Sequence, residues 1–149
     1  MLIPLPTEAD TAALASKIAP LLQAGDVLRL EGELGAGKST LARALLQALG
    51  TQSTHIPSPT FTLVQFYDDT RLPVAHIDAY RLKSPAELAM LGLEDYAREG
   101  VLLVEWPPVG LTHTAAEAGT LTLQLAIDGE GRTATLFGQG HWVEKLQRL

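Results

Sequence analysis

The amino-acid sequence predicts an α/β fold in which one mixed sheet, parallel at its centre and antiparallel at its flanks, carries helices on both faces. Apolar runs of strand length alternate with stretches of helix-forming residues along the chain. A glycine-rich segment, residues 32–37, joins one such run to a helix-forming stretch. The length of 149 residues and the apolar fraction of 46% suit one domain, residues 1–149, with a substantial core.

In the N-terminal third, Thr7–Asp10 resembles a capping box and predicts a helix over residues 8–24. A short apolar run over 26–31 predicts a strand that leads into the glycine-rich segment. Residues 38–49 are strong helix formers with leucines on one stripe. The expected order is therefore helix, strand, glycine-rich loop and helix.

In the middle of the chain, residues 61–67 and 73–80 read as strands. Their connector is too short for a crossover helix, so we expect them to pair antiparallel. Ser84–Glu87 supplies a helix start, which predicts a short helix to about Leu91. A helical turn at 93–98 then precedes an apolar strand over 101–105.

The C-terminal part predicts a hairpin and a last helix. Apolar and polar residues alternate over 121–127, and a turn at 128–131 leads into a second run over 132–137. This pattern is typical of two antiparallel strands with one buried face. A short helix is expected at 141–149.

Charge and composition limit the classes of function. The net charge of −6 argues against unaided binding to a nucleic acid, because such binding needs clustered Lys and Arg. The longest aliphatic run, 101–104, is too short to span a membrane, and the N-terminus lacks a signal pattern, so we expect a cytoplasmic protein with no membrane partner. The absence of cysteine excludes disulfides, thiolate nucleophiles and Cys-ligated zinc.

The strongest functional signal is Gly32–Ser39, which matches the pattern G-x-x-x-x-G-K-[ST] between a strand and a helix. The glycines let backbone N–H groups turn toward an anion, and the N-terminus of the following helix adds partial positive charge. Lys38 is expected to reach the β- and γ-phosphates, and Ser39 to place its hydroxyl on Mg²⁺. The motif therefore predicts a P-loop NTPase-like domain.

The base of the nucleotide is indicated by an absence in the sequence. Guanine-specific proteins of the common P-loop type use an Asn-Lys-x-Asp segment. This chain contains no asparagine and no Lys-x-Asp sequence. ATP is therefore favoured over GTP.

Two carboxylates end predicted strands and are candidates for the metal and the attacking water. Glu105 follows the apolar run 101–104, and Asp78 ends the strand that contains His76. Our hypothesis places Glu105 in the Mg²⁺ shell and assigns Asp78 to orient the water. There are two alternatives. The two carboxylates could exchange these roles, or either of them could simply cap the end of its strand.

Three further residues have both a functional and a structural interpretation. Thr60, within Ser58–Phe61, follows the P-loop helix, where NTPases keep a segment that senses the γ-phosphate; the alternative is an ordinary turn. Trp106 is either a core residue or a contact for a partner, and composition favours the core. A histidine within a strand, such as His76, is more often a hydrogen-bonded structural residue than a catalyst.

Five segments of the sequence form a combined pattern: Gly32–Thr40, Ser58–Val64, His76–Leu82, Leu91–Leu93 and Val104–Pro107. In order and spacing this pattern resembles the TsaE family, the small P-loop ATPases of bacterial tRNA threonylcarbamoyladenosine synthesis. The resemblance extends from about Pro4 to Arg132.

The resemblance implies a cytosolic ATPase, weak alone, that joins the TsaD and TsaB proteins. Those partners transfer a threonylcarbamoyl group to adenosine of ANN-decoding tRNAs, and ATP hydrolysis serves turnover of the assembly. The chain would meet tRNA only through that complex.

The resemblance also implies roles for particular residues. Ser39 and Glu105 would hold Mg²⁺, while Asp78, Thr60 and Lys38 would serve hydrolysis. Trp106 becomes a functional residue near the site, and Glu8 and Arg132 lie near the nucleotide. The residues expected on the phosphates are Gly35, Ala36, Gly37, Lys38, Ser39 and Thr40.

Two other functions share the P-loop. A small-molecule kinase needs an acceptor pocket and usually several arginines over the phosphates, whereas Arg71, Arg81 and Arg98 are scattered along this chain. A nucleotide-dependent switch would order Ser58–Phe61 on binding ATP, with hydrolysis incidental. Phosphoryl transfer to an added acceptor would indicate the kinase, and partner binding that differs between ATP and ADP without turnover would indicate the switch.

Overall fold

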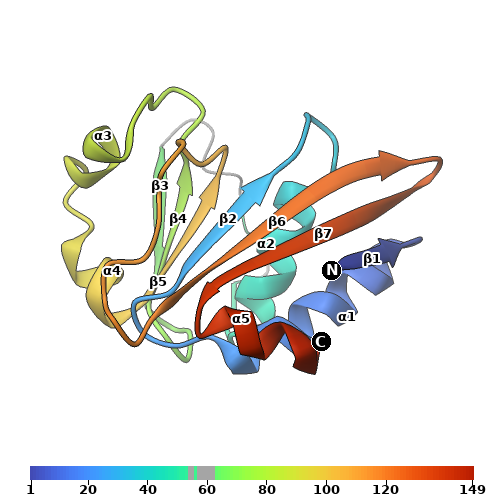
Figure 1. Ribbon diagram of the computed structural model, residues 1–149, viewed down its shortest axis with the longest axis horizontal. Helices are drawn as coiled ribbons and strands as arrows, with labels where there is room; N and C mark the ends of the chain where they lie inside the picture. Colours follow the sequence, from blue (N-terminus) through green and yellow to red (C-terminus); the bar gives the residue numbers. More distant parts are fainter. Residues whose placement is uncertain (54–55, 57–62) are drawn as a thin grey trace.

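The computed structural model describes residues 1–53, 56 and 63–149, which form one seven-stranded sheet with helices packed against it (Figure 1). The strands are β1 (Leu2–Leu5), β2 (Val27–Glu31), β3 (Val64–Tyr67), β4 (Val74–Asp78), β5 (Val101–Glu105), β6 (Gly119–Asp128) and β7 (Gly131–Gly140). The helices are α1 (Glu8–Ile18), α2 (Lys38–Ala48), α3 (Pro85–Ala89), α4 (Glu94–Glu99) and α5 (Trp142–Lys145), with 3₁₀ turns at Ala19–Leu21 and Leu146–Arg148. Within these ranges no helix has both the length and the apolar character that a membrane crossing requires.

The strand order is β1-β7-β6-β2-β5-β4-β3. Strands β6, β2, β5 and β4 are parallel, whereas β3, β7 and β1 pair antiparallel with their neighbours. The predicted parallel centre, the antiparallel flanks and the C-terminal hairpin are therefore confirmed. Strand β1 was not predicted; Pro4 interrupts its pattern, and proline is tolerated there because the strand lies at the edge of the sheet.

Each face of the sheet has its own hydrophobic core. On β5, Val101 and Leu103 belong to the larger core, which also contains buried residues of α1 and α2. Leu102 and Val104 point to the opposite face, where they pack with Leu88 of α3 and with residues of α4. The predicted helices on both faces are confirmed, and Figure 1 shows α3 and α4 set apart from α1 and α2.

Several element boundaries differ from the sequence prediction. The capping box of α1 is present, but the helix ends at Ile18 rather than at residue 24, because Pro20 has no N–H to continue it. The predicted helix at 141–149 consists of α5 and a 3₁₀ turn. Antiparallel pairing of β3 with β4 is confirmed from Val64 onward, and residues 61–62 lie outside the described ranges.

A fully buried carboxylate, Asp26, fastens the end of the sheet where β2 begins. Its Oδ1 accepts hydrogen bonds from the Gly119 N–H at 2.9 Å and from His141 Nε2 at 2.7 Å. Its Oδ2 accepts from the Gln23 N–H at 2.9 Å and from Trp142 Nε1 at 3.2 Å. One side chain thus links the start of β2, the start of β6 and the C-terminal helix.

Replacing this carboxylate should destabilise the fold strongly. We expect Asp26→Ala to lower the free energy of unfolding by about 3–5 kcal/mol, because four donors lose their acceptor and two of them, the Gly119 N–H and Trp142 Nε1, make buried hydrogen bonds. Asp128→Ala, at an exposed position of β6, should change it by less than about 0.5 kcal/mol. Urea unfolding measures both; similar losses in the two variants would contradict the assigned role of Asp26.

Candidate functional site

Residues 32–37, which we call the glycine loop, join the end of β2 to the start of α2. Gly32, Gly35 and Gly37 have φ values of 144°, 84° and 104°, a region that side-chain-bearing residues rarely occupy. The loop lies at the carboxyl ends of parallel strands, where open α/β sheets bind ligands. A Cβ built on Gly35 would meet no protein atom within 4 Å, so this part of the loop borders open space.

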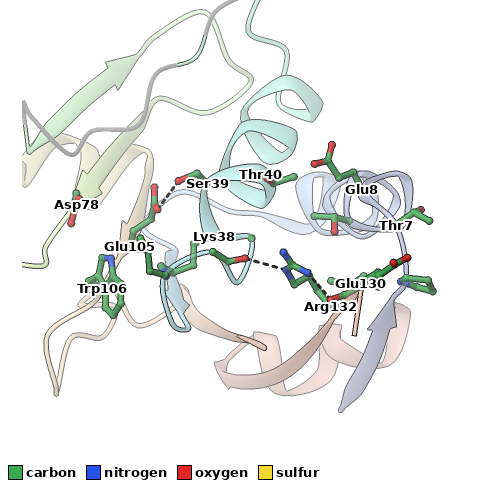
Figure 2. Close-up of a pocket in the computed structure, with 17 residues that line it drawn as sticks. Thr7, Glu8, Lys38, Ser39, Thr40, Asp78, Glu105, Trp106, Glu130 and Arg132 are labelled. Atoms are coloured by element: carbon green, nitrogen blue, oxygen red, sulfur yellow. Dashed lines mark hydrogen bonds between the residues drawn. The ribbon is translucent and has the colours of Figure 1, made fainter. Parts of the chain in front are cut away.

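A pocket of about 330 Å³ lies over the glycine loop and the first turn of α2 (Figure 2). Figure 2 shows Asp78, Glu105 and Trp106 at one end of it, and Thr7, Glu8, Glu130 and Arg132 at the other. The lining residues are Leu5, Pro6, Thr7, Glu8, Thr11, Leu34, Gly35, Gly37, Lys38, Ser39, Thr40, Asp78, Glu105, Trp106, Glu130, Gly131 and Arg132.

Lys38, the first residue of α2, brings a nearly buried ammonium group to this pocket. Its Nζ donates hydrogen bonds to the carbonyls of Gly32 at 2.5 Å and Glu33 at 3.0 Å. Burial lowers the pKa of Lys38 from its ordinary value, and the carboxylate of Glu105 opposes that shift. The Lys38 ammonium is therefore a cation whose hydrogen-bond partners are neutral carbonyls. It can exchange these carbonyls for the oxygens of a bound anion.

A hydroxyl and a carboxylate meet beside Lys38. Ser39 Oγ donates to Glu105 Oε1 at 3.2 Å, and Glu105 Oε2 lies 2.6 Å from Nε2 of the buried His76. Hard oxygen donors of these two types are the ligands that Mg²⁺ prefers. The donor set of Ser39 and Glu105 therefore fits a magnesium ion next to a bound phosphate.

Asp78 ends β4 directly beside Glu105, since their Cα atoms are partners in the parallel register. Its Oδ1 accepts a hydrogen bond from the Tyr80 N–H at 3.0 Å, so one carboxylate oxygen caps the turn after the strand. The residue nevertheless lines the pocket, and it also borders a neighbouring cavity of about 350 Å³. Asp78 therefore caps the turn after β4 and also lines the pocket.

Trp106 lies in the pocket, and the composition-based expectation of a core position was wrong. The side chain is only partly buried, and its ring centroid lies 4.0 Å from Lys38 Nζ. The backbone of Trp106 adopts φ 55°, a left-handed conformation in which strand alternation no longer sets the direction of the side chain. Tyr80 packs edge-on against the indole at a centroid distance of 5.1 Å.

The far end of the pocket is formed by the hairpin and by α1. Arg132 of β7 donates from Nε to the Gly35 carbonyl at 3.1 Å, which ties the hairpin to the glycine loop. Glu8, the first residue of α1, lines the same end, and Thr40 lies between the two ends in Figure 2.

Ala36, expected at the phosphates, is not among the residues that line the pocket. The side chain of Ala36 is buried in the core, and its N–H donates to the Glu33 carbonyl at 3.0 Å, so this N–H serves the turn of the loop. Thr60, like the rest of Ser58–Phe61, lies outside the described residues.

Two residues that line the pocket, and one that contacts its carboxylate Glu105, were missed by reasoning from the sequence. Thr7 was recognised only as the cap of α1, and Glu130 sits in the hairpin turn, where no motif marks it. His76 was read as an ordinary strand residue, although it contacts Glu105. The N-cap pattern could have drawn attention to Thr7; nothing local distinguishes Glu130.

The sequence and the fold match known proteins. The family model described as "Threonylcarbamoyl adenosine biosynthesis protein TsaE" matches residues 5–134. The chain belongs to the TsaE family. The matched range includes all the residues that line the pocket over the glycine loop, from Leu5 to Arg132.

Individual members of the TsaE family show how far the likeness extends. The tRNA threonylcarbamoyladenosine biosynthesis protein TsaE of Bacillus subtilis is 38% identical over 138 residues, which cover 92% of this chain and 85% of that protein. The Rickettsia felis protein of the same name is 39% identical over 105 residues, but the aligned part spans only 61% of its length. The crystal structure of Bacillus subtilis YdiB superposes with a TM-score of 0.71 at 32% identity, covering 99% of this chain and 90% of that one.

The conformation of the glycine loop in this TsaE-family chain can be tested with two alanine substitutions. A Cβ at Gly32 would lie 2.5 Å from the Leu125 carbonyl oxygen, in addition to the strain of its positive φ. We expect Gly32→Ala to lower the free energy of unfolding by about 3 kcal/mol. Gly35→Ala, with the strain but without the clash, should lower it by about 1 kcal/mol. Urea unfolding without nucleotide measures both, and the reverse ranking would contradict this loop geometry.

Proposed function

We propose that residues 1–149 form one P-loop nucleotide-binding domain that acts as a Mg²⁺-dependent ATPase in the cytoplasm. The observation that carries this proposal is the meeting, in one pocket, of the glycine loop, the buried ammonium of Lys38 and the Ser39–Glu105 pair. Membership of the TsaE family supports a role in the synthesis of threonylcarbamoyladenosine in tRNA.

In this proposal, the glycine loop and the first turn of α2 bind the phosphates through backbone N–H groups, with Gly35, Gly37 and Thr40 at the pocket surface. Lys38 releases the carbonyls of Gly32 and Glu33 to bind the β- and γ-phosphates. ATP rather than GTP is the proposed nucleotide because the chain has no Asn-Lys-x-Asp segment. Glu8 and Arg132 line the end of the pocket away from Asp78 and Glu105, and the proposal directs the nucleoside end of the ligand toward them.

Ser39 and Glu105 would hold Mg²⁺, Ser39 through its hydroxyl and Glu105 through its carboxylate. When bound there, the ion would supply positive charge beside the β- and γ-phosphates. Lys38 stabilises the same phosphate charge from the first turn of α2, and its ammonium lies over the face of the Trp106 ring. Asp78, next to Glu105 at the carboxyl ends of the strands, orients the attacking water. The hydroxyl of Thr60 is proposed to act near the γ-phosphate, in addition to that of Ser39.

The proposed partners are the TsaD and TsaB proteins. The net charge of −6 does not favour direct binding to tRNA, so tRNA would be reached through the complex. ATP binding and hydrolysis by this chain then serve turnover of that assembly, with a low rate in isolation and stimulation by the partners.

The first experiment measures ATP hydrolysis by the purified chain alone and after addition of TsaB, TsaD and tRNA. We expect the partners to stimulate ATP hydrolysis, and we expect both Lys38→Ala and Glu105→Ala to abolish this stimulation. Lys38→Ala removes charge stabilisation and Glu105→Ala removes a metal ligand, and each loss should lower the rate about 10²-fold or more. ATP binding without any stimulation would contradict the proposed ATPase role and favour a nucleotide-gated binding protein. Transfer of the γ-phosphate to an added acceptor would favour a kinase.

Asp78→Asn separates binding from hydrolysis. We expect the partner-stimulated rate to fall about 10²-fold or more, since the amide cannot act as a base toward water. The dissociation constant of Mg²⁺-ATP should stay within about threefold of the wild-type value, because Asp78 is not assigned to the phosphates or the metal. Asp128→Asn, at an exposed carboxylate on β6, is the matched control. Hydrolysis at the wild-type rate in Asp78→Asn would remove this residue from the mechanism.

A further inference from the structure

The two oxygens of Glu105 have different partners. Oε1 accepts from Ser39 Oγ at 3.2 Å, on the side of the glycine loop and α2. Oε2 lies 2.6 Å from His76 Nε2, in a buried contact between β5 and β4. Glu105 is 4% exposed and His76 is 1% exposed, so the second contact is shielded from water. Each oxygen therefore has a fixed direction.

The pairing of β4 with β5 creates this arrangement. Asp78 is the Cα partner of Glu105, and His76 lies two residues earlier on the same face of β4. Two groups on β4 thus flank one carboxylate on β5, Asp78 at the pocket and His76 beneath it. Asp78 lines the pocket, whereas His76 is not among the residues that line it.

His76 is poorly explained as a contribution to stability. Its Nδ1 is buried and has no hydrogen-bond partner among the residues that the structure describes. A buried polar atom without a partner costs free energy, so an apolar side chain would suit this position better if packing were its only purpose. Within those residues, the contact with Glu105 is the polar interaction that accounts for an imidazole here.

We propose that His76 is a positioning residue that donates from Nε2 to Glu105 Oε2 and so leaves Oε1 as the single oxygen that Glu105 presents to Mg²⁺. This inference rests on the proposed function, because it requires Glu105 to be a metal ligand. Partners of this kind orient metal ligands in many proteins, and their loss weakens metal binding about 10–100-fold. The proposal adds a chemical consequence, which is a preference for the smaller ion.

The preference follows from how the two common divalent ions use carboxylates. Mg²⁺ demands near-octahedral geometry and takes one oxygen from a carboxylate, whereas Ca²⁺ accepts both oxygens and a larger coordination number. With Oε2 held by His76, Glu105 cannot offer both oxygens to one cation. If the hydrogen bond from His76 to Oε2 is lost, the gain in ATP affinity that Mg²⁺ provides should fall more than the gain that Ca²⁺ provides.

The test compares His76→Gln with His76→Asn. The Gln amide can place an N–H near the position of Nε2, whereas Asn carries the same amide on a side chain one carbon shorter and cannot reach Glu105. Isothermal titration calorimetry gives the dissociation constant of ATP for each protein with Mg²⁺, with Ca²⁺ and with EDTA. The quantity compared is the gain in ATP affinity that each metal provides over EDTA, and thermal unfolding in EDTA verifies the fold.

In the Asn variant we expect the Mg²⁺-linked gain to fall about tenfold, and the Ca²⁺-linked gain to fall less. The affinity for ATP in EDTA should stay within about twofold of the wild-type value, and the Gln variant should keep most of the Mg²⁺-linked gain. If the Asn variant is unstable, His76→Leu, whose side chain suits a buried position, provides the same comparison with Gln. In a Glu105→Gln background, His76→Asn should have no further effect on the metal-linked gain, because the ligand that it orients is absent.

Three results would overturn the inference. An unchanged Mg²⁺-linked gain in the Asn and Leu variants would show that Glu105 needs no orientation. An equal loss of ATP affinity with Mg²⁺ and with EDTA would show that His76 only maintains the fold of the pocket. A wild-type protein whose ATP affinity does not depend on Mg²⁺ would overturn the proposed metal site together with this inference, which distinguishes the two failures.

Discussion

The register of the parallel strands β2, β5 and β4 is the constraint on which the site depends. In this register Glu105 has Leu30 on one side and Asp78 on the other, so the carboxylates of two strands meet beside the glycine loop. Side chains alternate between the two faces of a strand, so a shift of one residue would turn Glu105 away from α2. Every contact of the proposed metal site follows from this alignment.

The two hydrophobic cores hold that register from both faces. The leucines and valines of β5 alternate between the core under α1 and α2 and the core under α3 and α4, and each core rejects a slipped strand. Burial of α2 also fixes its first turn, which places the mostly buried Lys38 side chain at the pocket. The cost of that burial is limited by the two loop carbonyls and by nearby carboxylates.

The glycine loop, the capping box of α1, the parallel centre of the sheet and the C-terminal hairpin were all predictable, because each depends on neighbouring residues or on strong periodicity. Strand β1 was not, since its pairing with β7 compensates for a weak local pattern that contains Pro4. Helix α1 was predicted too long because the effect of Pro20 was given too little weight. The position of Trp106 was misjudged because composition favours burial of a tryptophan and carries no information about the left-handed backbone that follows β5.

The sequence by itself determined the family, the glycine loop with Lys38 and Ser39, and the two strand-end carboxylates, because these are short patterns whose chemistry needs particular residues at fixed spacing. Only the tertiary structure decided which groups share the pocket with them. Thr7 and Glu130 come from elements far apart in the chain, and His76 contacts Glu105 from the neighbouring strand. Such contacts depend on strand register and on the packing of the hairpin against the loop, which no local stretch of sequence specifies.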